Sequence, residues 1–299
     1  MEDLTDLLTP WCVHTVATLK IAERIDGVAE VGELAAAAGC DREALHDVLS
    51  HLVSKGVFEE PAPGRFALND AARELFAASG FLSLDGIGGR MAYAWSTLPK
   101  YVKTGRPAYA DVFGLPFWED LAANPDVAAS FDELMGMAGH GTPDARFELA
   151  SGWDAIHTVV DVGGGTGAML RELLKLRPEL EGVLVDLPGT VARAEGVAVA
   201  GQSFFDPLPP ADLYVVRKVI NDWPLEDQVR ILRHCRPHVV AIGGVRPDDA
   251  PRTLTIETVL LGGRTSGLSQ FRELAREAGL EVIAAGEQPA GFVVECVEN

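Results

Sequence analysis

The chain has 299 residues, 47% of them hydrophobic and 23% charged, and its 25 basic and 44 acidic side chains give a formal net charge of −19. This length is sufficient for two hydrophobic cores, and no apolar run approaches the roughly 18 residues that a membrane span needs. Because a strongly acidic protein repels phosphate backbones and anionic lipids, neither a nucleic acid nor a membrane is an expected partner.

The first 90 residues predict a mainly α-helical winged-helix domain. Apolar residues at helical spacing over 4–25 predict an amphipathic helix, and a second subunit is one place to bury its apolar face. Two short helices follow over 31–40 and 41–55, with Asp41 as a helix cap. In 57–68 a turn rich in Pro and Gly separates two β-prone runs. Helix, helix and hairpin in this order are typical of a winged helix.

Winged helices often bind DNA, so a regulator is one possible function of this domain. The predicted recognition helix carries Arg42 and Lys55 against Asp41, Glu43 and Asp47, and it lacks the basic cluster that phosphate contacts require. We therefore expect a platform for dimerisation. A DNA-binding regulator remains the less favoured alternative.

Residues 91–150 predict a helical linker between the two domains. Aromatic and methionine side chains in this region either line a pocket or fill a core. The candidate substrate contacts are Trp95, Phe131, Met135 and His140. For His140, capping of a helix C-terminus is the alternative role.

Residues 151–299 predict an α/β domain with a doubly wound, Rossmann-like sheet, because short Val-rich and Leu-rich runs alternate with helical stretches. The run 158–162 is a buried strand that leads directly into the glycines of 163–167 and then into a helix. Glycines allow a tight turn and the close approach of a ligand to a helix N-terminus. Asp186 ends the following strand, where a carboxylate binds ribose hydroxyls. The motif therefore predicts a nucleoside site.

The spacing of Gly163, Gly165 and Ala168 also fits the dinucleotide pattern, so a nicotinamide enzyme is a rival at this step. Asp161 favours a different ligand. A carboxylate two residues before the first glycine opposes a pyrophosphate and attracts the ammonium of an amino acid. The carboxylate at Asp161 therefore favours S-adenosylmethionine as the cofactor, with S-adenosylhomocysteine as its demethylated product.

The chain resembles the bacterial small-molecule O-methyltransferases that are related to plant caffeate and acetylserotonin O-methyltransferases and include anthracycline and polyketide-tailoring enzymes. The resemblance spans nearly the whole chain and implies an intertwined homodimer that acts on a small aromatic molecule. It also implies that the helical middle, residues 91–150, caps the substrate. The segments that carry it are LTPWCVHTVATLKIAERI, GRPAYADVFGLPFWEDLAANPDVAASFDELM, DVGGGTG, SFFDPLP, NDWPLEDQVRILRHC and LLGGRTSGLSQFRELAREAGL.

The resemblance also implies which residues form the cofactor site. These are Asp161, Gly163, Gly165, Asp186, Leu187, Ser203, Phe204 and Arg217. Three positions depart from the common family pattern. Ser203 stands where Asp is frequent, Asn221 where the family carries a His general base before Asp222 and Trp223, and Thr265 where a Glu usually orients that His.

Asn cannot accept a proton, so the expected mechanism is methyl transfer by proximity and orientation, with Asn221, Asp222 and Thr265 as the catalytic positions. The expected acceptor is a phenol, enol or carboxylate that ionises easily. A family member that keeps the cofactor but performs hydroxylation, decarboxylation or a pericyclic step is the alternative. No spacing of His, Cys, Asp and Glu predicts a metal site. Four widely spaced cysteines and the absence of a basic, apolar leader predict a cytoplasmic protein. The resemblance implies an enzyme of secondary metabolism.

Overall fold

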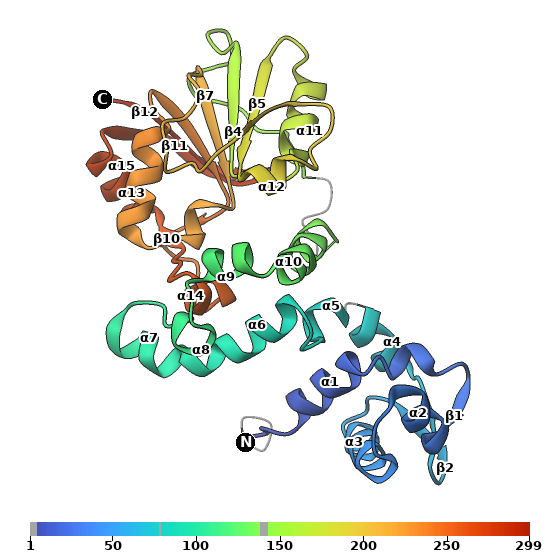
Figure 1. Cartoon of the computed structure of the whole chain (residues 1–299). Helices are drawn as coiled ribbons and strands as arrows, with labels where there is room; N and C mark the ends of the chain where they lie inside the picture. Colours follow the sequence, from blue (N-terminus) through green and yellow to red (C-terminus); the bar gives the residue numbers. More distant parts are fainter. Residues whose placement is uncertain (1–4, 78, 138–142) are drawn as a thin grey trace. The chain divides into compact units, whose positions relative to one another are not determined.

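The computed structural model describes residues 5–77, 79–137 and 143–299, and it divides into two compact units (Figure 1). The N-terminal unit comprises Met1–Ser96 and Trp118–Gly139, and the C-terminal unit comprises Thr97–Phe117 and His140–Asn299. The division into three parts near residues 90 and 150 stays a prediction. Within the described ranges, no helix is long and apolar enough to cross a bilayer.

The N-terminal unit is mostly helical and contains one small antiparallel sheet. Its strands β1 (Val28–Glu30), β2 (Glu59–Ala62) and β3 (Arg65–Ala67) pair in the order β1-β3-β2. Asp41 caps the N-terminus of α3, as predicted, by accepting a hydrogen bond of 2.9 Å from the Ala44 backbone N–H. The helices are α1 (Thr9–Thr18), η2 (Ala22–Arg24), α2 (Val31–Ala38), α3 (Arg42–Ser54), α4 (Asp70–Ala77), α5 (Ser79–Leu82), α6 (Ile87–Ala94), α9 (Phe117–Ala123) and α10 (Pro125–Met137).

The helix that we predicted over 4–25 is shorter than expected, because α1 ends at Thr18. Lys20 has a φ of 54°, and this left-handed residue turns the chain out of the helix. The Ile21 N–H then bonds the Val16 carbonyl at 3.0 Å, which closes the helix end in the manner of a C-terminal capping motif. The one-turn helix η2 follows.

The C-terminal unit contains a seven-stranded sheet in the order β11-β12-β8-β7-β4-β5-β6. Strands β6 (Ala198–Gly201), β5 (Glu181–Asp186), β4 (Thr158–Val162), β7 (Leu213–Arg217) and β8 (His238–Ile242) are parallel, whereas β12 (Gly291–Glu298) and β11 (Leu280–Gln288) run antiparallel at one edge. The one-turn helix η3 (Trp95–Thr97) spans the point in the chain where the two units divide. The other elements of the C-terminal unit are α7 (Leu98–Thr104), α8 (Ala110–Phe113), α11 (Ala168–Leu176), α12 (Pro188–Val191), η4 (Ile220–Asp222), α13 (Leu225–His234), β9 (Val245–Arg246), α14 (Ile256–Leu260), β10 (Ser266–Gly267) and α15 (Leu268–Glu277).

Apolar side chains form a core on each face of this sheet. Val160 and Val162 of β4 pack into the cluster that contains α13 and α15, whereas Val159 packs into the cluster that contains α11. Figure 1 shows α11 on one side of the sheet and α13 and α15 on the other. The strand order reverses between β4 and β7, so the carboxyl ends of these strands border the crevice where such folds bind ligands. The predicted α/β, Rossmann-like fold class is confirmed.

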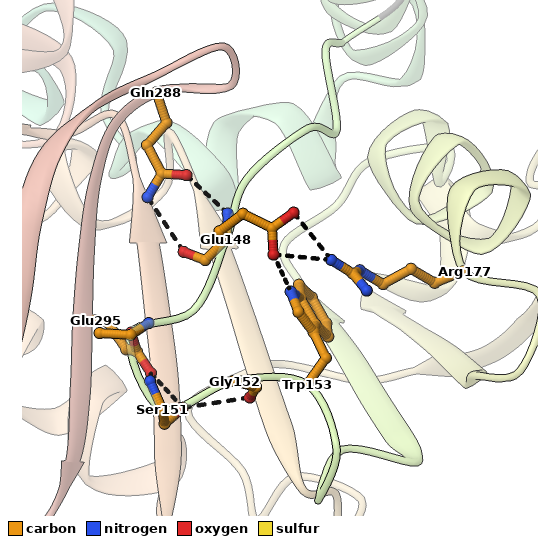
Figure 2. A network of polar contacts seen from close by, with 8 residues as sticks. Glu148, Ser151, Gly152, Trp153, Arg177, Gln288 and Glu295 are labelled. Atoms are coloured by element: carbon orange, nitrogen blue, oxygen red, sulfur yellow. Dashed lines mark hydrogen bonds and ion pairs between the residues drawn. The ribbon is translucent and has the colours of Figure 1, made fainter.

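A polar network fastens the segment before β4 to the antiparallel edge of the sheet (Figure 2). The buried Glu295 carboxylate accepts hydrogen bonds from the Ser151 hydroxyl at 2.6 Å and the Ala150 N–H at 2.5 Å, and it also bonds His238 Nε2 at 3.0 Å. Gln288 bonds both the N–H and the carbonyl of Glu148, at 2.7 and 3.1 Å. These contacts fix the direction from which the chain enters the central strand.

Candidate active site

The loop after β4 needs glycine for steric reasons. Gly163, Gly165 and Gly167 have φ values of 67°, 63° and 81°, which side-chain-bearing residues rarely adopt. A Cβ on Gly163 would lie 2.8 Å from Val219, at the end of β7, and one on Gly164 would lie 2.2 Å from Asp161 Oδ2. Around Gly165 there is open space within 4 Å, so a ligand can approach this part of the backbone.

Asp186 ties the end of β5 to this glycine loop. Its Oδ2 accepts a hydrogen bond of 2.8 Å from the Gly165 N–H, and its Oδ1 accepts one of 2.7 Å from the Leu187 N–H. The Leu187 side chain is 45% exposed beside it, although it is large and apolar. The structure therefore brings together three of the predicted cofactor residues at adjacent strand ends.

Asp161 lies deeper than we expected. Its side chain is 1% exposed and sits beneath Gly164, and neither carboxylate oxygen accepts a hydrogen bond of normal geometry within the described residues. Burial raises the pKa of Asp161 to about 7; the nearby Leu170 amide and Arg217 charge oppose this rise, and the Asp186 charge adds to it. Arg217 is half-buried at the end of β7, and burial lowers its pKa. The predicted contact between Asp161 and an ammonium stays a prediction.

Three aromatic rings cluster beside the glycine loop. Phe204 and Phe205 meet Trp223 edge to face, with ring centroids 5.6 and 4.7 Å apart. A Cβ on Gly163 would lie 3.4 Å from the Phe204 ring, so this ring borders the loop. Its predicted contact with adenine stays a prediction. The Ser203 hydroxyl accepts a hydrogen bond of 3.2 Å from the Phe205 N–H, so this oxygen stabilises its own turn. Its predicted contact to the cofactor stays a prediction.

The turn η4 carries Asn221 and Asp222, two of the predicted catalytic residues. Asn221 Nδ2 donates a hydrogen bond of 2.9 Å to Asp222 Oδ1. Burial raises the pKa of Asp222 to about 8, and the negative charge of Glu257 in α14 adds to the rise. A Cβ on Gly263 would lie 2.5 Å from the Asn221 carbonyl oxygen, so the loop after α14 packs directly on the turn.

Sequence analysis did not identify Glu257, whose charge acts on Asp222 in the structure. It selected Thr265 as a catalytic position instead. Thr265 is exposed in the loop before β10, and its place among the predicted catalytic positions stays a prediction. The only sequence signal for Glu257 is a single acidic residue within the apolar run that precedes Gly262 and Gly263. Nothing in that pattern indicates which charge it faces, because Asp222 lies 35 residues earlier in the chain.

The predicted substrate contacts belong to another part of the chain. Trp95 and Phe131 lie in the N-terminal unit, where Phe131 meets Trp118 edge to face at 5.8 Å between ring centroids. Met135 lies within α10, and His140 lies outside the described residues. Their role in substrate binding stays a prediction. In the described part of the chain, no group of three or more His, Cys, Asp and Glu side chains is placed to hold a metal ion.

Known proteins are similar to this chain in sequence and in fold. A curated relative, the 2,7-dihydroxy-5-methyl-1-naphthoate 7-O-methyltransferase of Streptomyces carzinostaticus, is 36% identical over 98% of this chain and 95% of its own length. The aclacinomycin 10-hydroxylase RdmB of Streptomyces purpurascens is 33% identical over 97% of this chain and 86% of its own length.

A solved structure agrees with these relatives. The crystal structure of the O-methyltransferase NcsB1 from neocarzinostatin biosynthesis, in complex with S-adenosylmethionine and 2-hydroxy-5-methyl naphthoic acid, matches with a TM-score of 0.87 at 33% identity. The match covers 99% of this chain and 98% of that one. The sequence profile of the O-methyltransferase domain family matches residues 95–280, which is more than half of the chain. The chain therefore belongs to the O-methyltransferase domain family.

Proposed function

We propose that this protein transfers a methyl group from S-adenosylmethionine to a phenolic or enolic hydroxyl, or to a carboxylate, of a small aromatic natural product. The observation that carries the proposal is the glycine loop after β4, which Asp186 ties to the end of β5 in a chain of the O-methyltransferase family. The relatives support the substrate class, because one is named for a naphthoate and NcsB1 was crystallised with a naphthoic acid.

The residues at the strand ends fit the methyl donor. Asp186 offers a carboxylate for ribose hydroxyls, and Leu187 and Phe204 offer apolar surface for an adenine ring. The open space around Gly165 admits a ligand, and Asp161 is a buried carboxylate without a hydrogen-bond partner among the described side chains. When bound, S-adenosylmethionine supplies an electrophilic methyl group on a good leaving group.

The protein's own contribution to rate is mainly orientation. Holding two reacting atoms within about 3 to 3.5 Å is worth roughly 7 to 11 kcal/mol, whereas a general base contributes on the order of 10² to 10⁴-fold. Replacement of the usual His by Asn221 therefore lowers the rate without abolishing methyl transfer.

Calorimetry and product analysis test this function. We expect the purified protein to bind S-adenosylmethionine and S-adenosylhomocysteine, and we expect Gly163→Ala to lose this binding, because its Cβ would meet Val219 at 2.8 Å. With carboxylated naphthols and phenols, product masses should rise by one methylene unit. Failure to bind either sulfur compound contradicts the assignment.

A second function is favoured by the relative RdmB, which is named a hydroxylase, and by Asn221 at the position of the family's base. In that case the protein keeps the cofactor and performs hydroxylation, decarboxylation or a pericyclic step. Recovery of intact S-adenosylmethionine alongside a converted substrate distinguishes this function from methyl transfer.

We also propose that the enzyme is a cytoplasmic homodimer. Leu7, Leu8 and Trp11 of the N-terminal segment are exposed in the single chain, and all four cysteines are free thiols. A second subunit that covers these apolar side chains would stabilise the assembly. Light scattering coupled to gel filtration should give twice the mass of one chain, and a monomeric mass contradicts the dimer.

A further inference from the structure

The polar turn at the end of β7 holds one side-chain amide in a defined orientation. Asn221 Nδ2 donates to Asp222 Oδ1, while Asn221 Oδ1 is buried and lacks a hydrogen-bond partner in the described ranges. Gly244 lies against that oxygen, since a Cβ there would approach it to 2.6 Å. Gly244 thus packs closely on the side-chain amide of Asn221.

Asp222 keeps one carboxylate oxygen for another group. Its Oδ1 receives the Asn221 amide, whereas Oδ2 accepts no hydrogen bond from the residues that the structure describes, and the side chain is only half-buried. The turn that carries it adjoins the glycine loop, because Val219 packs on Gly163 and Trp223 meets Phe204. The turn that carries Asp222 thus borders the proposed donor site.

The charges around Asp222 favour its protonated form. Burial raises its pKa to about 8, and the like charge of Glu257 adds to the effect. Within the described residues, no cation is among the groups that shift this pKa. Other charged groups on the neighbouring segments include Arg217 and the exposed Lys218 before the turn, and Glu226 and Asp227 after it. Arg264 donates a hydrogen bond to Tyr101 Oη.

We propose that Asp222 is the catalytic residue that takes the proton from the acceptor hydroxyl, with Asn221 and Glu257 as positioning residues. This inference rests on the proposed function and places the base one residue after the family's usual position. In the step, the acceptor O–H proton passes to the Asp222 carboxylate as the oxygen forms its bond to the methyl carbon. The carbon–sulfur bond breaks with its electron pair on sulfur, so a carboxylate and a sulfonium become a carboxylic acid and a thioether.

A carboxyl group in this environment suits a phenolic acceptor. With a pKa of about 8, about a tenth of Asp222 is ionised at pH 7 and half at pH 8. Its basicity is far above that of an exposed carboxylate and close to the working pH, which is where general-base catalysis is most effective. Glu257 therefore raises the basicity of Asp222 without contacting the acceptor.

The first measurement follows the carboxyl group itself. In protein labelled with ¹³C at aspartate carboxyl carbons, we expect one resonance that titrates near pH 8 and is missing from Asp222→Asn. In Glu257→Gln its midpoint should fall by about one pH unit, because a like charge is removed. Glu226→Gln, an exposed carboxylate at the start of α13, is the matched control and should leave the midpoint unchanged.

The second measurement is the pH profile of kcat/KM for a phenolic acceptor. The wild-type rate should rise with a midpoint near pH 8, and this midpoint should move down in Glu257→Gln. Asp222→Asn should lose about 10² to 10⁴-fold in rate while it keeps its affinity for S-adenosylhomocysteine. A nitro-substituted acceptor that is already ionised should restore most of the rate of Asp222→Asn, since it has no proton to lose.

The outcomes separate this inference from the proposed function. If the wild type transfers methyl groups and Asp222→Asn is as fast, or if no aspartate resonance that is missing from Asp222→Asn titrates above pH 6, the role of Asp222 is wrong and the methyltransferase assignment stands. If the wild type transfers no methyl group to any phenol or carboxylate, both are wrong.

Discussion

Replacing Asp161 by Asn should change the pH dependence of stability in a way that the burial of its carboxyl group dictates. The native pKa of Asp161 is raised from 3.8 to about 7 by burial. Between these two values the native state holds a proton that the unfolded state has released, so the free energy of unfolding falls as pH rises. Above pH 7 both states are ionised, and this dependence ends. Asn carries no such proton.

The magnitude follows from the width of this window. Each pH unit in it is worth about 1.4 kcal/mol, so from pH 5.5 to 7 the wild type should lose about 2 kcal/mol relative to Asp161→Asn. The new amide leaves N–H groups without acceptors beneath Gly164, which costs about 1 to 3 kcal/mol at every pH. This constant cost decides which of the two proteins is more stable at a given pH. The change of their stability difference with pH reports the carboxyl group alone.

Calorimetric melting from pH 5.5 to 8.5 measures how the stability difference changes with pH. This pH range lies above the isoelectric point of about 4.7. The difference in Tm between Asp161→Asn and wild type should grow by about 4 to 8 °C up to pH 7 and then remain constant. Asp154→Asn, at an exposed turn, is the control and should show no pH-dependent difference. A difference for Asp161→Asn that is the same at pH 5.5 and pH 8 would refute a buried carboxyl with a raised pKa.

Three further variants probe the site and its support. Gly244→Ala places a side chain at a φ of 84° and 2.6 Å from Asn221 Oδ1, so kcat should fall at least tenfold in assays while calorimetry shows a loss of about 1 to 2 kcal/mol. Asp186→Asn removes a charged acceptor, and calorimetric titration should show S-adenosylhomocysteine binding about 10 to 100-fold more weakly. Glu295→Gln leaves buried donors without a carboxylate and should lower the stability of the C-terminal unit by about 3 to 5 kcal/mol on melting, whereas an unchanged Tm contradicts its anchoring role.

The sequence was most informative where local chemistry decides the structure. The strand 158–162, the glycine loop and the helix cap Asp41 follow from residue periodicity, glycine conformation and short-range hydrogen bonds, and the structure places each as predicted. The length of α1 did not follow, because Lys20 adopts a left-handed conformation that its residue type does not signal. The grouping of residues 97–117 with the C-terminal unit depends on long-range packing, which a local pattern does not contain.

The site was predictable at the ends of strands and less so in its electrostatics. Asp186 joins the glycine loop as its place after a buried strand suggested. Asp161 was identified as important, but its burial beneath Gly164 depends on how the loop folds back over it. The link between Asp222 and Glu257 required the structure, since a carboxylate far away in sequence raises the pKa of Asp222 only when packing brings the two groups together.

Sequence identity alone does not separate methyl transfer from another reaction in this family. The relative named as a naphthoate methyltransferase and the one named as a hydroxylase are 36% and 33% identical to this chain, which is too small a difference to decide. The loss of the usual His is equally indecisive, because a well-positioned acceptor that ionises easily needs little help from a base. A carboxyl group at Asp222 with a pKa near 8, held by Asn221 and influenced by Glu257, is useful to an enzyme that removes a proton from a phenol. A reaction that removes no proton gains nothing from such a group, and its raised pKa then only lowers the free energy of unfolding as pH rises from about 4 to 8. The pH profile of the Asp222 and Glu257 variants therefore bears on the reaction type as well as on the residue.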